Sequence, residues 1–418
     1  MRKHTWKAAV SAAAIAAIAT IPMAANADTV ITNGVTWRYV VNDATKKTVT
    51  LGEISGFDST TAATDSNRAM PANTAIDASL IPWTFDVDGE TYTVTALSSS
   101  AFNGCTKLTG VVSFPSAVKT LGRSCFSSTK VRIASFNGLT TVYGYGFGSL
   151  PAQPFPAMPN VATFGKGVFY GATFTGTVRF SDPNTIVSWR SFMNAKGVEA
   201  ILAVDSTKTF NVDQMADGAT NMKVIFMGPR TKGSSLSNGN MLNSVTGCKV
   251  YVPANGNWDG LVTGGSNNEI IYYGASTNLD FSVDDAVGKV VATPTTEEAL
   301  VKALVAAPLF KTHFGWDMKV ETTNAIDVTV GTLTPGMFAN AGVKAGSLML
   351  NFAVKTQAQL NDVLAAVPSD VMVGIDPTGL TENMVVTDRE NVFVKNVPGM
   401  TVRRRANGGF AILVLRSR

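Results

Sequence analysis

A short phrase that ends in phenylalanine repeats along the first half of this 418-residue chain. In the first four copies, apolar residues stand eight and five positions before the phenylalanine, and weaker copies end at Phe192 and Met215. One unit of this length cannot bury its own apolar face, so such units stack into a solenoid. We therefore predict that anchors separated by 24, 21, 22 and 23 residues form one buried column: Phe102, Phe126, Phe147, Phe169 and Phe192.

Strand-like triplets keep the same period. They stand at 112–114, 131–133, 178–180, 202–204, 224–226 and 250–252, whereas Pro-rich sequence replaces the triplet after Phe147. One strand per repeat at a period of about 20–29 residues indicates a leucine-rich-repeat solenoid. Side chains alternate along a strand, so the middle residues of the triplets should point away from the core. These are Ser113, Arg132, Arg179, Ala203, Ile225 and Tyr251.

Three of these outward positions are the predicted binding residues of the solenoid. Arg132, Arg179 and Tyr251 are chosen because Arg and Tyr are enriched at the hot spots of binding surfaces. A plain solvated sheet face explains the same residues equally well.

The stretch from Ala101 to Phe126 resembles the BspA-type leucine-rich repeat. That family's phrase runs Ala-Phe, a Cys three residues later, a Leu, a Val-x-Ile-Pro strand, then Val-x-x-Ile-Gly and Ala-Phe again. The resemblance covers residues 90–255 and weakens along the chain, where Gly146 and Val168 replace the Ala. It implies a bacterial secreted or surface protein whose solenoid serves in binding or adhesion and not in catalysis.

The N-terminus predicts export. Three basic residues precede a short apolar core, and Ala25-Asn26-Ala27 fits a cleavage site. We therefore predict a signal peptide over residues 1–27 and a β-rich cap over 28–95. The apolar core is too short to span about 30 Å of hydrocarbon, and no later stretch is apolar enough to do so. The expected location is secreted, cell-surface or periplasmic.

Charge and side-chain chemistry exclude several functions. Loss of the signal segment lowers the formal net charge from +4 to +1, which argues against nucleic acid as a partner. His313 would be the one remaining histidine, and no catalytic motif surrounds it, so we predict no enzyme, no cofactor and no metal site. Cys105 and Cys125 occupy packing positions of the repeat; two buried thiols are the favoured interpretation, and a disulfide is the alternative.

The pattern changes near residue 280. We predict that residues 256–294 are the solenoid end and a linker, and that 295–418 form a small domain. Thr295 and Glu298 fit a capping box, which predicts a helix that ends before Pro308. The predicted fold class is α+β: a BspA-like leucine-rich-repeat solenoid followed by a small α+β C-terminal domain.

Residues 312–376 resemble part of a PDZ domain. The tripeptide Phe314-Gly315-Trp316 is similar to the loop that holds a peptide carboxylate in that family, and a helix with Gln359-Leu360 follows where the groove helix stands. The resemblance implies that a C-terminal peptide adds as a strand, its carboxylate bound by backbone N–H groups. The alternative is an unrelated module with Leu360 in its core.

Two functions follow from these patterns. The first is a secreted or cell-surface interaction and adhesion protein that binds a protein or glycan through the solenoid. The alternative is a periplasmic protein that recognises C-terminal peptides through the PDZ-like domain.

Overall fold

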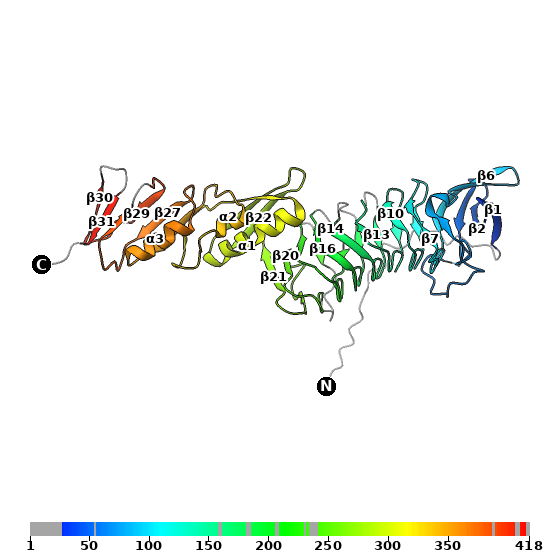
Figure 1. Ribbon diagram of the computed structural model, residues 1–418, viewed down its shortest axis with the longest axis horizontal. Coiled ribbons are helices and arrows are strands. Elements are labelled where there is room, and N and C mark those ends of the chain that lie inside the picture. Colours follow the sequence, from blue (N-terminus) through cyan, green and yellow to red (C-terminus); the bar gives the residue numbers. More distant parts are fainter. Residues whose placement is uncertain are drawn as a thin grey trace, which may run out of the picture.

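The computed structural model describes residues 27–53, 56–157, 161–180, 185–204, 209–229, 231–233, 241–386, 389–405 and 410–414. The predicted signal peptide, except for Ala27, lies outside the described residues. The described chain forms an elongated molecule, with the solenoid at one end and the C-terminal strands and helices at the other (Figure 1).

A first ladder of strands runs along the solenoid (Figure 1). Its N-terminal strands are antiparallel to one another, and from β3 to β19 successive neighbours are parallel. β5 joins the ladder at its edge, where it forms a hairpin with β6. The strands are β1 (Asp28–Thr32), β2 (Val35–Asp43), β3 (Thr48–Leu51), β5 (Thr84–Val87), β6 (Glu90–Leu97), β9 (Thr120–Leu121), β11 (Thr141–Val142), β13 (Thr163–Phe164), β15 (Ile186–Val187), β17 (Thr209–Phe210) and β19 (Lys232–Gly233).

A second set of parallel strands contains the predicted triplets. β8 pairs with β10, and a longer sheet follows in the order β12-β14-β16-β18-β20-β21. Residues 153–154 form β12, so the repeat after Phe147 does have a strand, contrary to the prediction. The bounds are β8 (Val111–Ser113), β10 (Arg132–Ser135), β12 (Gln153–Pro154), β14 (Thr173–Arg179), β16 (Lys196–Ala203), β18 (Val224–Met227), β20 (Lys249–Pro253) and β21 (Glu269–Tyr273).

The anchor phenylalanines form a continuous stack inside the solenoid. All five are fully buried. Successive ring centroids are 5.0, 6.1, 6.1 and 5.2 Å apart, and the ring planes differ by 8–24°. Each anchor N–H donates to the carbonyl of the residue before the next anchor, as Phe169 does to Ser191 at 3.0 Å. Phe192 donates to Met215, so Ala216, and not Met215, holds the next anchor position.

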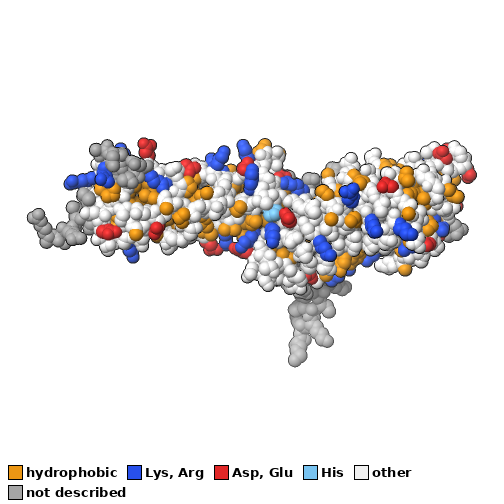
Figure 2. Space-filling model, in the orientation of Figure 1, with side chains coloured by type: hydrophobic (Ala, Val, Ile, Leu, Met, Phe, Trp, Pro, Cys, Tyr) orange, Lys and Arg blue, Asp and Glu red, His pale blue; other side chains and the backbone are white. Residues whose placement is uncertain are grey.

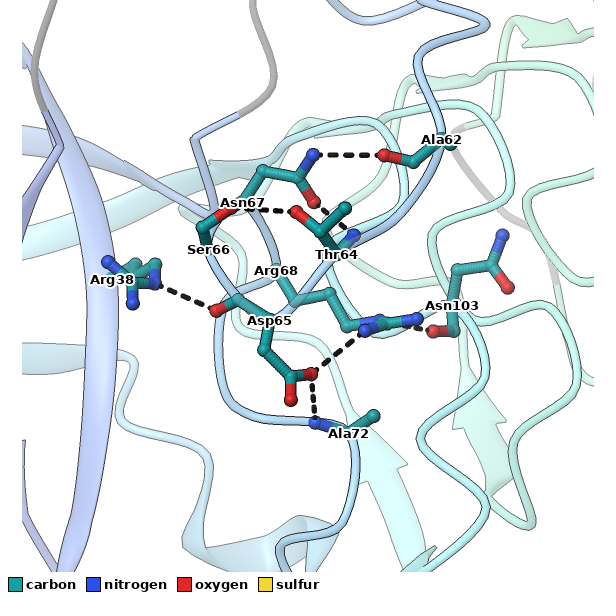
Figure 3. Close-up of polar contacts among 9 residues, drawn as sticks. All are labelled: Arg38, Ala62, Thr64, Asp65, Ser66, Asn67, Arg68, Ala72 and Asn103. Carbon is teal, nitrogen blue, oxygen red and sulfur yellow. Dashed lines mark hydrogen bonds and ion pairs between the residues drawn. The ribbon is translucent and has the colours of Figure 1, made fainter.

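The N-terminal cap contains a loop that is held by its own polar side chains (Figure 3). Asp65 accepts hydrogen bonds from the Arg68 guanidinium and the Ala72 amide, both at 2.9 Å. Arg68 also donates to the Asn103 carbonyl at 2.6 Å, and Arg38 donates to the Asp65 carbonyl at 3.2 Å. The loop therefore ties the cap to the first coil. Nearby, β4 (Ile76–Asp77) pairs with β7 (Leu108–Thr109), and a 3-10 helix covers Ala78–Leu80.

The C-terminal part begins with a sheet in the order β22-β23-β24 and the helix α1. α1 connects two parallel strands, β23 and β24. Thr296, and not Thr295, caps the helix by accepting from the Ala299 amide at 3.3 Å. The helix also continues past Pro308, contrary to the prediction. The bounds are β22 (Leu279–Asp284), β23 (Lys289–Pro294), α1 (Glu297–Phe314) and β24 (Asp317–Val320).

A second parallel sheet follows in the order β25-β26-β27-β29. α3 connects β26 and β27, and buries Leu360, Val363 and Ala366. Three antiparallel strands, in the order β28-β31-β30, end the described chain. The bounds are β25 (Ile326–Asp327), α2 (Met337–Ala341), β26 (Met349–Ala353), α3 (Gln357–Ala366), β27 (Met372–Asp376), β28 (Met384–Val386), β29 (Val392–Val394), β30 (Met400–Arg404) and β31 (Phe410–Val414).

An aromatic junction joins the solenoid to the C-terminal part. α1 lies against β14 and β16, and the outward side chains of the last coils share one apolar cluster with α1 and β22–β24. Phe226 is central: its ring centroid is 5.1 Å from Trp316 and 5.4 Å from Phe310, both edge to face. The junction consists of Phe226, Tyr251, Tyr273, Phe281, Phe310, Phe314 and Trp316.

Candidate binding surfaces

The predicted strand face is exposed in the first coils and covered in the last. Ser113 and Arg132 point to solvent. Ala203 and Ile225 were predicted to point outward, but they belong to the solenoid core. In these two strands the alternation of inward and outward side chains is shifted by one residue from the predicted one, and such a shift reverses the two faces of a strand.

Of the three predicted binding residues, Arg132 and Arg179 are exposed and Tyr251 is buried. The prediction of an exposed Tyr251 is wrong: its side chain is fully buried in the junction, 4.9 Å from Phe310 between ring centroids. Arg179 is 43% exposed and forms an ion pair with Asp285, with 3.1 Å between its Nη1 and Oδ1. It also donates to the Phe314 carbonyl, so Arg179 is a contact between the two parts of the chain.

The tripeptide Phe314-Gly315-Trp316 does not form an open carboxylate loop. Both aromatic side chains are buried in the junction. Gly315 ends α1 with a φ of 76°, a conformation that favours glycine, and its amide donates to the Lys311 carbonyl at 3.1 Å. The Trp316 amide donates to the Phe310 carbonyl at 3.2 Å. These amides are therefore engaged within the chain, and the predicted peptide groove is not confirmed.

A different surface lies along the turns between the first ladder and the anchors. In the turns before all five anchors, the residue two positions before the phenylalanine has a left-handed backbone: φ is 59° at Ser100, 54° at Ser124, 57° at Tyr145, 58° at Gly167 and 59° at Arg190. This repeated conformation reverses the chain just before the buried phenylalanine. It leaves the residues next to it only partly buried, and in three consecutive coils several of them are aromatic or basic.

Rings and cations in neighbouring turns contact one another. The Arg123 Cζ lies 4.9 Å from the Tyr145 ring centroid. Tyr145 meets Tyr170 edge to face, with 5.8 Å between centroids. Because a cation within about 6 Å of a ring face is attracted to it, these contacts fix the side chains of three coils. Arg123 also forms an ion pair with Asp58 of the cap, at 3.3 Å.

The same pattern continues around Trp189. The Lys166 Nζ lies 3.9 Å from the Trp189 ring centroid, and the Arg190 Cζ lies 4.4 Å from it. Arg190 also donates to the Gln214 side chain at 2.5 Å, which links the next coil. We call this set the aromatic–cation surface; it consists of Arg123, Tyr143, Tyr145, Lys166, Tyr170, Trp189 and Arg190.

The aromatic–cation surface has the composition of a protein-binding site. Trp, Tyr and Arg dominate binding hot spots, because rigid rings and planar cations bury much area at a low cost in side-chain entropy. The sequence prediction missed these residues because it assigned contacts to the strand triplets. The available signal was the clustering of aromatic and basic residues directly before the anchors, as in Tyr143-Gly-Tyr145 and Trp189-Arg190.

Within the described ranges, no cluster of three or more His, Cys, Asp or Glu side chains forms a metal site. His313 has one acidic neighbour, Glu199 at 3.6 Å, and burial lowers the pKa of the imidazole. Cys105 and Cys125 are buried free thiols, as favoured above, and Cys248 is a third. Burial raises the pKa of Cys105 to about 11.

Charge is spread rather than concentrated on the face shown in Figure 2. Basic side chains occur along both halves of the molecule, with acidic side chains among them. In the described part of the chain, no helix is both long enough and apolar enough to cross a membrane.

The comparison with family models agrees with the repeat pattern. A family model of the BspA type leucine-rich repeat region matches residues 90–211 in six copies. Among solved structures, the chain is similar to a leucine-rich repeat protein from Bacteroides ovatus ATCC 8483, at 12% identity over 88% of each chain and a TM-score of 0.29. It is also similar to a leucine-rich cell surface protein from Faecalibacterium prausnitzii A2-165, at 12% identity, a TM-score of 0.23, and coverage of 80% of this chain and 97% of that chain. No curated protein matches. The family model spans the coils that carry the aromatic–cation surface.

Proposed function

Since residues 90–211 are a BspA-type leucine-rich-repeat region, we propose that the protein is an exported bacterial interaction protein. It binds a partner protein through the aromatic–cation surface, and the C-terminal part lengthens the molecule without contacting the partner. The observation that carries this proposal is the partly exposed, mutually braced set of rings and cations around Trp189. Preformed contacts of this kind lower the ordering cost of binding.

The surface favours a partner with acidic and aromatic side chains. Lys166 and Arg190 both contact the Trp189 indole. An incoming carboxylate can pair with either cation while an apolar group of the partner packs beside the ring. Tyr145 and Tyr170 extend the apolar area to the next coils.

The test is selection of random peptides from a displayed library on the full chain, followed by affinity measurement. We expect enrichment of acidic and aromatic peptides, and a loss of roughly 30-fold in affinity for the double variant Tyr145→Ala/Trp189→Ala, because hot-spot truncation costs about 2 kcal/mol or more. The matched control is Ser113→Ala/Arg132→Ala, which changes the exposed strand face and should keep the affinity. Equal binding by both double variants would overturn the proposal.

Point variants are preferable to truncation for this test. Removal of the C-terminal part would expose the outward apolar side chains of β16, β18 and β20, which the junction buries: Ala200, Leu202, Val224, Phe226 and Tyr251. Such a fragment would present a new apolar surface and capture peptides for an unrelated reason.

A further inference from the structure

A cleft of about 880 Å³ opens over the second C-terminal sheet. Its lining comes from the carboxyl ends of the four parallel strands β25, β26, β27 and β29 and from the first turn of α3. In open sheets with parallel strands, ligands bind in the crevice outside the carboxyl ends of the strands. The volume is within the range of about 300–1,000 Å³ that is usual for small-molecule sites.

Strand register places the lining side chains in rows. The pairs Asp327–Asn351, Asn351–Gly374 and Gly374–Phe393 are direct neighbours on adjacent strands. Asp376 and Lys395 each stand two residues further along their own strands, and therefore on the same face. The row therefore has polar side chains, Asp327 and Asn351, at one end and the Phe393 ring at the other. All three line the same cleft.

The middle of the row is open because position 374 is glycine. A Cβ on Gly374 would lie 2.2 Å from the Asn351 Oδ1, so a side chain there would collide with the amide. Phe393, on the other side of the glycine, is 53% exposed. An exposed phenylalanine beside a glycine floor presents an apolar platform to a ligand.

The polar groups of the cleft are held in place by one another. Asn351 donates to Asp327 at 3.1 Å, and Lys395 donates to Asp376 at 2.8 Å. The hydrogen bond from Lys395 lowers the pKa of Asp376 to about 2, so that carboxylate is ionised at ordinary pH. Two carboxylates and the Asn351 Oδ1 offer acceptors, whereas Lys395 and the Gln359 amide offer donors.

We propose that this cleft binds a neutral oligosaccharide. Hydroxyl groups both donate and accept, so a sugar can satisfy the carboxylates and the ammonium together, while its apolar ring face lies on Phe393. The net negative lining disfavours an anionic ligand, and the Asp376–Lys395 pair removes one of the two charges that would attract a simple cation. This site is independent of the aromatic–cation surface and goes beyond the function proposed above.

The test is saturation-transfer difference NMR of the full chain with a panel of neutral disaccharides and oligosaccharides, followed by calorimetry of the best binder. We expect saturable binding, and a loss of about tenfold or more in affinity for Phe393→Ala and for Asp327→Asn. Both side chains are on the surface, so folding should be preserved. Met372→Ala is the matched control, because Met372 is 41% exposed on β27 but does not line the cleft.

Three outcomes would overturn the proposal. The first is no saturable binding of any neutral sugar at millimolar concentration. The second is binding that Phe393→Ala and Asp327→Asn leave unchanged, which would place the sugar elsewhere. The third is that an extended peptide, tested in parallel, binds in the cleft and no sugar does. Trp189→Ala should not change sugar binding, which separates this result from the test of the aromatic–cation surface.

Discussion

Two aromatic clusters hold this molecule together, and they are built differently. In the solenoid column, each coil contributes one phenylalanine, and successive rings are nearly parallel. In the junction, rings come from three strands of the solenoid (β18, β20 and β21), from β22, from α1 and from the turn after α1. They meet mostly edge to face, as Phe226 and Trp316 do at 90°. The column grows by repetition of one contact, whereas the junction is a single assembly of residues from distant segments.

The difference shows what each cluster contributes. In the column, each coil contacts only the coils before and after it. The free energy of unfolding is therefore close to the sum of the stabilities of the single coils and of the interfaces between neighbours. The junction ends that series by covering the outward face of the last strands, which would otherwise lie open to water. It therefore couples two parts of the chain that the repeat alone would leave independent.

The largest expected effect comes from the column. Phe169→Ala removes a fully buried ring that stacks on Phe147 and Phe192 and also contacts Phe155 and Phe174. We expect the free energy of unfolding to fall by about 3–5 kcal/mol. Chemical denaturation followed by circular dichroism measures it.

Phe169→Leu is the matched control for this prediction. It keeps most of the buried volume, and the expected loss is smaller. If Phe169→Ala unfolds at the same denaturant concentration as the unaltered protein, the column is not the source of solenoid stability.

The column could be predicted from the sequence because its period is explicit. The junction was missed, although a signal existed. Strands covered on both faces read as continuous apolar runs, and Val224-Ile225-Phe226-Met227 is such a run, buried at every position. By contrast, Arg132-Ile133-Ala134-Ser135 in β10 has one buried side chain and an exposed neighbour on each side.

What the sequence could not supply was the identity of the covering segment. Phe310, Phe314 and Trp316 have no periodic relation to the solenoid strands, so their contacts depend on how α1 docks. The aromatic–cation surface was missed for another reason: its residues lie in turns, and their clustering before the anchors does not show which side chains meet. The proposed sugar site could not be predicted either, because which side chains line it depends on the register of four strands.

The second prediction concerns the junction. Phe226→Ala should lower the free energy of unfolding by about 3 kcal/mol, at the low end for buried phenylalanine, because two packed surfaces can shift to close part of the cavity. It should also let the last coils, whose outward face the junction covers, unfold before the first coils. The readout is labelling of Cys248, which directly precedes β20 and whose pKa is raised to about 12 by burial.

Cys105 and Cys125 report on the first coils in the same experiment. Burial raises the pKa of the Cys105 thiol to about 11, so it stays protonated and unreactive in the folded state up to about pH 10. In Phe226→Ala, Cys248 should react at lower denaturant concentration than the other two thiols. Simultaneous labelling of all three would contradict a separate junction.

A third change should stabilise the junction. The Tyr251 hydroxyl is buried, and among the described residues it has no hydrogen-bond partner. Burial of an unpaired hydroxyl costs about 1–3 kcal/mol, so Tyr251→Phe keeps the ring contacts and removes that cost. We expect the free energy of unfolding, measured by thermal or chemical denaturation, to rise by about 1 kcal/mol. A loss of similar size would mean that the hydroxyl has a partner in solution, such as a bound water.

The smallest effect is expected at the edge of the junction. Arg179 pairs with Asp285, which is 37% exposed and also accepts from the Trp316 indole at 2.6 Å. Because partly exposed ion pairs contribute little, Arg179→Ala should lower the free energy of unfolding by about 0.5–1 kcal/mol, and less at high salt. Arg179→Lys is the control, since one ammonium cannot reach both Asp285 and the Phe314 carbonyl. If Arg179→Ala destabilised the protein as much as Phe226→Ala, the two parts would be held by this polar contact, and the contrast between stacked column and edge-to-face junction would lose its physical basis.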